Sequence, residues 1–256
     1  MTILTNCAAC AAPLDDDAAR CVGCRTCYCS EACLRYHAHR GGHDDEKCAE
    51  IDRGGSAEQY HADKQHTEAV AAAVEACADD KKGQTCYICM DGLDPDTNEG
   101  LVRGCACRGT AGFAHVSCLA RQAKTLVAEA EENNLDDKAF EKKWKRWHAC
   151  GLCEQDYHGV VKCALGWACW KTYVGQPEVD RLRRPAISML GSGLFAVGHH
   201  EDTLSVYEAE LSTMRRLGDS EERMLIVQGN ITNVYQLLGR LEQALSLRRD
   251  VYMQAI

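Results

Sequence analysis

The sequence predicts small α+β modules stapled by bound metal, followed by an all-α segment of helical-hairpin repeats. Three observations lead to this fold class. Eighteen cysteines occur among 256 residues, many of them in closely spaced pairs. Aromatic residues make up only 6% of the chain, so few large side chains are available to build a large hydrophobic core. Small modules that lack such a core are usually stabilised by bound metal instead. The last part of the chain has helical periodicity and repeats itself after 41 residues.

The amino-terminal stretch MTILTNCAAC has neither a basic segment nor an apolar one, so we expect no secretory signal and a cytoplasmic or nuclear protein. Disulfides are rare in such compartments, and repeated CxxC pairs with interspersed histidines indicate zinc sites. The longest apolar run, VVKCALGWACW, is interrupted by Lys162 and is too short for a membrane span, so we expect a soluble protein.

The charge argues against nucleic acid as a partner. The formal net charge is −9 and the sequence pI is about 5.6, whereas phosphate binding depends on clustered lysine and arginine. The one basic run, KKWKRW at 142–147, is first of all a solvated helix face, with a docking patch as the alternative.

The opening block holds the first set of candidate ligands. Structural zinc takes four nitrogen or sulfur ligands in a tetrahedron, so eight ligands make two sites. A CxxC turn also leaves backbone N–H groups free to stabilise the thiolates. The spacing alone allows either two sequential sites or two interleaved ones. The eight candidates are Cys7, Cys10, Cys21, Cys24, Cys29, Cys33, His43 and Cys48.

This block, with its YCSEAC segment and late histidine and cysteine, resembles a MYND-type zinc finger over residues 7–48, and we place the module at 1–52. The resemblance implies interleaving. One zinc would be held by Cys7, Cys10, Cys29 and Cys33, and the other by Cys21, Cys24, His43 and Cys48. It also implies a peptide-binding role without catalysis.

Two points in this block stay open. His37 and His39 are rivals of His43 as the ligand, although each is expected to be an exposed helix residue. Cys27 is expected to be a small buried hydrophobic residue rather than a ligand.

Residues 53–84 are expected to form a helical linker, with a helix near 58–78. Alanines favour the helix, but few large apolar residues are available to bury. Cys77 has no companion at ligand spacing and is expected to be an inert thiol.

A second set of eight candidates follows. They are Cys86, Cys89, Cys105, Cys107, His115, Cys118, Cys150 and Cys153. The C4HC3 order, with one residue between Cys105 and Cys107 and seven before His115, resembles a RING-CH finger, a RING variant, which we place at 85–158. A PHD finger shares the ligand order but has a much shorter gap between its sixth and seventh ligands.

The RING-CH resemblance implies cross-braced zinc sites. Cys86, Cys89, His115 and Cys118 would hold one ion, and Cys105, Cys107, Cys150 and Cys153 the other. The chain must then turn from one ion to the other within a few residues, and Gly109, Ala111 and Gly112 leave room for that turn. Phe113 is expected to pack between the sites.

The same resemblance implies a ubiquitin ligase that positions a ubiquitin-conjugating enzyme carrying ubiquitin for attack by a protein substrate, without a catalytic residue of its own. Ile88 and Trp147, or Trp144, are candidate contacts with that enzyme, or else core residues. Glu154 stands where active fingers often have a basic residue. The long 118–150 gap, expected to contain helices at 116–132 and 136–148, is a further departure.

A connecting helix is expected at 159–178, with Cys163 and Cys169 as core thiols. Over 179–256, GHHEDTLSV from Gly198 aligns with GRLEQALSL from Gly239, and these segments resemble kinesin-light-chain tetratricopeptide repeats. Such arrays need about three units, so we expect truncation or pairing through the open end.

Two functions from different classes compete. The first is a ubiquitin ligase whose MYND finger and repeats bind protein substrates or peptides. The second is a non-enzymatic scaffold that uses the same modules to join proteins, favoured by Glu154 and the long gap. Zinc hydrolase chemistry is disfavoured because no HExxH element occurs and both ligand sets are closed, with no position open for water. We expect four zinc ions, two per finger.

Overall fold

The computed structural model describes residues 7–10, 14, 18–40, 42–79 and 81–254; side chains are described as far as Arg249. The first six residues, on which the expectation of no signal peptide rests, lie outside this part. The chain forms two compact units. One comprises 1–64, 174–188 and 200–256, and the other 65–173 and 189–199.

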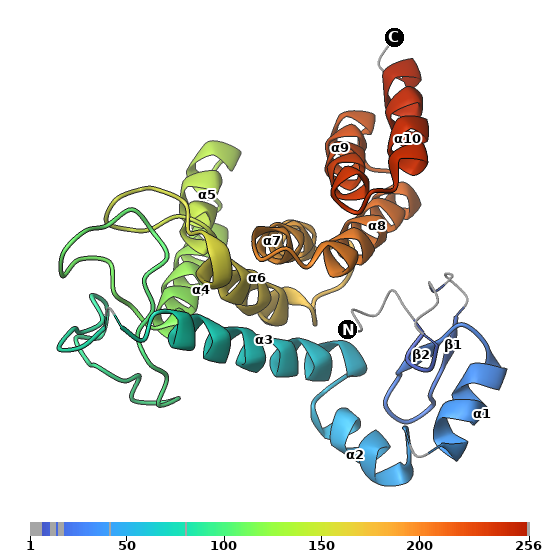
Figure 1. The fold of residues 1–256 in the computed structure, drawn as a ribbon, viewed down its shortest axis with the longest axis horizontal. Coiled ribbons are helices and arrows are strands. Elements are labelled where there is room, and N and C mark those ends of the chain that lie inside the picture. Colours follow the sequence, from blue (N-terminus) through green and yellow to red (C-terminus); the bar gives the residue numbers. More distant parts are fainter. Residues whose placement is uncertain (1–6, 11–13, 15–17, 41, 80, 255–256) are drawn as a thin grey trace. The chain divides into compact units, whose positions relative to one another are not determined.

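Helices dominate the described residues, and the one sheet has two strands of two residues each (Figure 1). The sequence predicts α+β modules, but this short two-stranded sheet is the only sheet in the described residues. The elements are β1 (Ala19–Arg20), β2 (Cys27–Tyr28), α1 (Glu31–His39), α2 (Asp45–Arg53), α3 (Ala57–Ala76), α4 (Val116–Glu132), α5 (Asp137–Trp144), the 3-10 helix η1 (Lys145–Trp147), α6 (Gly159–Tyr173), α7 (Arg183–Ala196), α8 (His200–Leu217), α9 (Glu221–Leu237) and α10 (Leu241–Gln254).

Local capping fixes the helices that carry or border the candidate ligands. Ser30 caps α1 by accepting from the Cys33 amide, and Asp44 caps α2 by accepting from the Lys47 amide. Asp136 does the same for α5. These side chains satisfy amides that the first turn of a helix leaves without partners, so each helix begins where its cap stands.

The first finger has a very small apolar core. β1 pairs antiparallel with β2, and Tyr28 of β2 is fully buried. The hydrophobic cluster beside it consists of Cys24, Ile51 and Ala57, with Tyr60 packed against it. So few apolar side chains cannot hold a fold of this length, in agreement with the expectation that metal replaces a core here.

The second finger has a larger core than its sequence suggested. Helix α4 packs against α6, and α6 is buried around most of its circumference, including Trp167, Trp170 and Cys169. Trp144 and Trp147 meet Tyr173 of α6 at ring-centroid distances of 5.7 and 5.9 Å. Metal therefore supplements an apolar helical core in this unit. Cys163 and Cys169 are buried thiols, as expected.

Helix α3 is more than a spacer, because each of its ends packs against a neighbour. Its first residue, Ala57, belongs to the small core of the first finger. Near its other end, Val74 packs so closely on Gly100 that a side chain at Gly100 would meet it at 2.7 Å. Just beyond the helix, the Cys77 thiol accepts from the Arg103 amide at 3.4 Å and so has a structural role.

The carboxyl-terminal segment consists of α7, α8, α9 and α10. Helix α8 begins at His200 and α10 begins at Leu241, so their first residues are 41 positions apart, the same period as the sequence repeat. Both preceding glycines, Gly198 and Gly239, have φ values of 77° and 72°, a conformation that side chains rarely adopt. Helix α9 packs on both α8 and α10. Helices α8, α9 and α10 thus pack on one another in chain order.

Candidate metal centres

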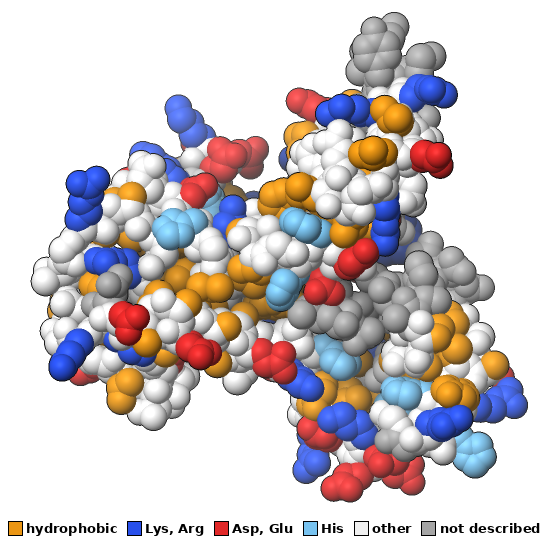
Figure 2. All heavy atoms as spheres, in the orientation of Figure 1, with side chains coloured by type: hydrophobic (Ala, Val, Ile, Leu, Met, Phe, Trp, Pro, Cys, Tyr) orange, Lys and Arg blue, Asp and Glu red, His pale blue; other side chains and the backbone are white. Residues whose placement is uncertain are grey.

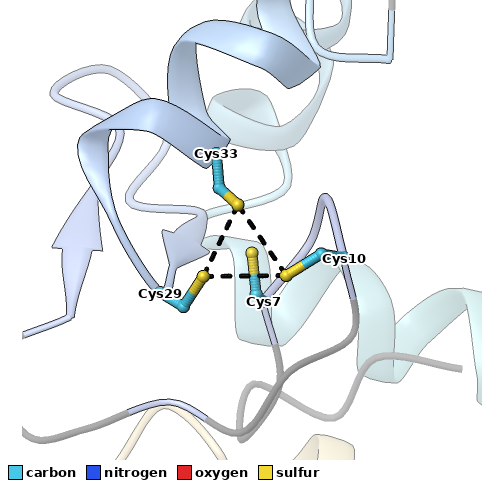
Figure 3. Close-up of side chains that lie close together, drawn as sticks. All are labelled: Cys7, Cys10, Cys29 and Cys33. Carbon is cyan, nitrogen blue, oxygen red and sulfur yellow. Dashed lines mark hydrogen bonds between the residues drawn. The ribbon is translucent and has the colours of Figure 1, made fainter.

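The first finger brings its candidate ligands into two groups of four that interleave along the chain. In one group Cys7 and Cys10 come from a loop, Cys29 precedes α1, and Cys33 lies in the first turn of α1; all four side chains point toward one another (Figure 3). The sulfur atoms of Cys10, Cys29 and Cys33 are 3.5–3.7 Å apart.

The other group of the first finger contains Cys21, Cys24, His43 and Cys48. The Nε2 atom of His43 lies 3.3 Å from the Cys21 sulfur and 3.5 Å from the Cys24 sulfur. His37 is outside the group, because its Nδ1 atom lies 3.2 Å from the Tyr28 hydroxyl. His39 is exposed at the end of α1. The structure therefore favours His43 over both rivals. Cys27 is buried and lies outside both groups.

The second finger has the same interleaved arrangement. Its two groups are Cys86, Cys89, His115 and Cys118, and Cys105, Cys107, Cys150 and Cys153. In the first group the Nδ1 atom of His115 lies 3.5 Å from the Cys89 sulfur and 3.6 Å from that of Cys118. In the second, the sulfurs of Cys107 and Cys150 are 3.8 Å apart. Residues 105–118 thus contribute to both groups.

The donor sets and distances fit zinc. Each group offers four ligand atoms, all within 4.8 Å of one another, either from four cysteines or from three cysteines and one histidine. Around a tetrahedral zinc, sulfur atoms lie about 3.8 Å apart and sulfur and nitrogen about 3.5 Å apart, given the usual bond lengths of about 2.3 and 2.0 Å. The observed separations of 3.3–3.8 Å agree, and the cysteines are free rather than disulfide-bonded. The described residues therefore contain four clusters able to bind zinc, one ion each.

Backbone amides of the knuckles stabilise the thiolates. Burial raises the pKa of the Cys7 thiol, but hydrogen bonds from the backbone of Cys29, Ala9 and Cys10 outweigh it and lower the pKa to about 6. The Ile88 amide donates to the Cys86 sulfur at 3.4 Å, and the Leu152 amide to the Cys150 sulfur at 3.4 Å. Such amides favour the deprotonated form that a metal requires.

Gly112 makes the tight turn between the two groups of the second finger possible. It has a φ of 84°, and a side chain there would come within 2.5 Å of Cys107 Cβ and about 3 Å of the Cys107 and Cys105 sulfurs. Gly109 also has a positive φ, of 61°. Ala111 is exposed and its size is not constrained by this turn. Phe113 is buried, with the Arg103 guanidinium 4.4 Å from its ring centroid.

The two candidate contact residues differ in exposure. Trp147 is fully buried against Trp144 and Tyr173 and has no surface to offer a partner, so its role is in the core, the alternative that the sequence left open. Trp144 is also buried. Ile88 is partly exposed on the first knuckle. Ile88 can therefore contact a partner protein, whereas the two buried tryptophans cannot.

Sequence reasoning missed Glu99, which holds the start of α4 and thereby His115 and Cys118. The cap residue of α4, His115, makes no capping hydrogen bond with its own side chain. Instead the buried Glu99 carboxylate accepts from the amides of Val116 and Ser117 and from the Ser117 hydroxyl. No local sequence signal reveals this contact, because the capping residue lies 17 positions before Val116.

Replacing Glu99 with alanine is expected to lower the free energy of unfolding of the second finger by about 1–2 kcal/mol, because several buried amide and hydroxyl donors lose their acceptor. Glu132→Ala, at the exposed other end of α4, is the matched control. The measurement is chemical denaturation of the zinc-loaded protein followed by circular dichroism. Equal stability of the two variants would contradict a capping role for Glu99.

Comparison with known protein families identifies the second finger. The family model of the RING-variant domain matches residues 86–153, the span of its eight candidate ligands. Residues 86–153 therefore form a RING-variant, or RING-CH, domain. No curated protein and no solved structure matches the chain. None of the described helices is long and apolar enough to cross a membrane.

Proposed function

We propose that the protein is a RING-CH ubiquitin ligase that recruits a ubiquitin-conjugating enzyme through the second finger. The observation that carries this proposal is the RING-variant match over residues 86–153 together with two interleaved Cys/His groups in the same span. The sixteen predicted ligands would hold four zinc ions, two in each finger. Zinc supplies structural cross-links there, since each group is a closed four-ligand set.

An exposed apolar surface on the two knuckles supports recruitment of a partner. Gly151 of the last knuckle lies beside Tyr87 of the first, where an added side chain would be 3.6 Å from the Tyr87 hydroxyl. Ile88 follows Tyr87, and Leu152, which follows Gly151, is 52% exposed. Apolar side chains in water on neighbouring rigid loops are typical of a protein-binding surface.

The charge next to the last ligand is less unfavourable than the sequence suggested. Glu154 follows Cys153, but its carboxylate pairs with Arg146 at 2.6 Å and Lys145 at 3.2 Å. Hydrogen bonds from these two residues lower the pKa of Glu154. The group of three therefore carries one net positive charge, which removes the main electrostatic argument against a ubiquitin contact at this place.

We further propose the division of labour expected from the sequence. Residues 1–52 would form a MYND-type finger and 179–256 a tetratricopeptide-like segment, both binding protein substrates or peptides. Residues 53–84 and 159–178 would connect them to the finger at 85–158. In the scaffold alternative the chain has the same modules and binds the same classes of protein, but the second finger does not recruit a conjugating enzyme.

An autoubiquitination assay with a panel of conjugating enzymes tests the proposal. The wild-type chain is expected to form ubiquitin chains with at least one enzyme, and Ile88→Ala to reduce the rate about tenfold or more, because a central apolar contact is lost. Val22→Ala is the matched control, since Val22 lies fully exposed in a CxxC knuckle of the first finger. Both variants should keep four zinc ions. Absence of product with every enzyme would contradict the ligase proposal and favour the scaffold alternative.

A further inference from the structure

One of the four candidate zinc groups has ligands in contact with solvent. It is the group of Cys7, Cys10, Cys29 and Cys33, called the Cys7 group below, in which Cys10 and Cys29 are exposed and Cys33 is half-buried. Each of the other three groups consists of buried and half-buried ligands. In Figure 2 side chains of the hydrophobic class, which includes cysteine, reach the surface between charged ones over the first finger. A reagent dissolved in water therefore meets the sulfur atoms of the Cys7 group first.

The two exposed sulfur atoms of this group are neighbours. The sulfur of Cys10 lies 3.6 Å from that of Cys29, and the two side chains point toward each other (Figure 3). A backbone hydrogen bond, from the Ala8 amide to the Cys27 carbonyl at 3.1 Å, holds the two segments together two residues before each cysteine. This bond involves no ligand atom, so it helps to keep Cys10 beside Cys29 when a metal ion leaves. Since a disulfide bond is about 2.0 Å long, the two sulfurs need to approach by only about 1.5 Å.

The other two cysteines of the group are less accessible. Cys7 is 1% exposed, so a dissolved oxidant does not reach its sulfur. Cys33 is half-buried, and its amide donates to the Ser30 hydroxyl that caps α1, which fixes Cys33 in the first turn of that helix. Whichever exposed sulfur is oxidised first, the neighbour that solvent also reaches is the other exposed one. The geometry thus selects the pair of Cys10 and Cys29.

We propose that the Cys7 group is an oxidative modification site, at which peroxide converts Cys10 and Cys29 to a disulfide and the zinc ion of the group is released. Peroxide gives one oxygen to an exposed thiolate, so that its O–O bond breaks, a sulfenic acid forms, and hydroxide leaves. The second thiolate attacks this sulfur, the S–S bond forms, the S–O bond breaks, and a second hydroxide leaves. Both hydroxides take up a proton. Two thiolates, two protons and one peroxide thus give one disulfide and two waters, and the two electrons lost by the sulfurs reduce the peroxide.

The modification acts on one zinc site of the first finger. Cys7 and Cys33 alone are too few ligands for a structural zinc site, which needs four. The disulfide then takes the place of the ion as the cross-link between the amino-terminal loop and the residues before α1. The other three groups keep their ions, because their sulfurs are less accessible. Thiol reductants reverse the change, since a disulfide is a reversible product of oxidation.

Treatment of the full zinc-loaded chain with increasing amounts of hydrogen peroxide tests this site. Native mass spectrometry counts the ions that remain, and thiol alkylation followed by trypsin digestion identifies the cysteines that have reacted. We expect one ion to leave about tenfold or more faster than the other three, because oxidation of thiolates follows their exposure. The first disulfide should join the tryptic peptide 1–20, through Cys10, to the peptide 26–35, through Cys29. Dithiothreitol with added zinc should restore four ions.

Two variants isolate the pair. Cys27→Ala is the matched control, because Cys27 belongs to the same tryptic peptide as Cys29 but is buried and lies outside the groups. It should change neither the rate nor the product. Cys10→His keeps a zinc ligand but removes the second thiol, so the link between the two peptides should no longer form. The cysteine-by-cysteine result for the wild-type chain decides the question even where Cys10→His binds only three ions.

Three results would overturn the proposal. One is loss of zinc from the Cys21 group or from the second finger at the same peroxide dose as from the Cys7 group. Another is a first disulfide within a single peptide, between Cys29 and Cys33 or between Cys7 and Cys10. The third is release of the ion without any disulfide, which would mean that oxidation only destroys the ligands.

Discussion

Removal of zinc with a strong chelator is expected to unfold the first finger and to leave part of the helical core of the second unit in place. Structural zinc sites contribute on the order of 10–16 kcal/mol of apparent binding free energy to folding. The first finger has little else, since its hydrophobic cluster is limited to Cys24, Ile51 and Ala57, with a few half-buried side chains packed against it. In the second unit α4 and α6 also pack on one another through apolar side chains, so this part has a core besides its candidate metal ligands.

Hydrogen exchange with mass spectrometry, before and after chelation, measures this difference. Protection should vanish over 7–48 and over the loops of 85–115, and should persist in part over α4 and α6. The Cys7 group should release its ion first, because Cys10 and Cys29 are exposed, whereas the other three groups contain no exposed ligand. Uniform loss of protection across both units, or an unaffected first finger, would contradict this account.

Trp147→Ala is expected to lower the free energy of unfolding by about 3–5 kcal/mol, the usual cost of truncating a buried aromatic side chain. Trp147 has no exposed surface, and its ring centroid lies 6.4 Å from that of Trp144 and 5.9 Å from that of Tyr173. Alanine leaves a cavity between the last knuckle and α6. Urea denaturation followed by circular dichroism measures the loss.

Trp147→Phe is the matched variant, because it keeps an aromatic ring and should cost clearly less than alanine. A loss below about 1 kcal/mol for Trp147→Ala, a value typical of surface positions, would show that the aromatic cluster does not hold the finger to α6. It would also reopen a partner contact for Trp147.

Much of the site could be predicted because ligand chemistry is local in sequence. CxxC knuckles, the Cys105–Cys107 spacing and the late histidines define the sets that the structure groups together. The helix expected at 116–132 coincides with α4, and that expected at 136–148 corresponds to α5 and η1. Gly198 and Gly239 likewise mark turns that the structure contains.

The rest depends on contacts between residues far apart in sequence. Composition indicated a metal staple in place of a core, but it could not show that Trp144 and Trp147 would meet Tyr173 of α6. Neither could it show that Glu99 would cap α4, or that Arg146 would neutralise Glu154. Each of these depends on the way the finger folds back on its helices, which carries no signature in local spacing.

The metal content of the purified chain tests the central claim most directly. Native mass spectrometry should find four zinc ions per chain. Cys10→Ser, Cys24→Ser, Cys89→Ser and Cys107→Ser, one in each group, should each reduce the number to three, while Cys77→Ser and Cys163→Ser, outside the groups, should keep four. A wild-type chain with two ions or fewer, or full occupancy in the four group variants, would contradict the four-centre account.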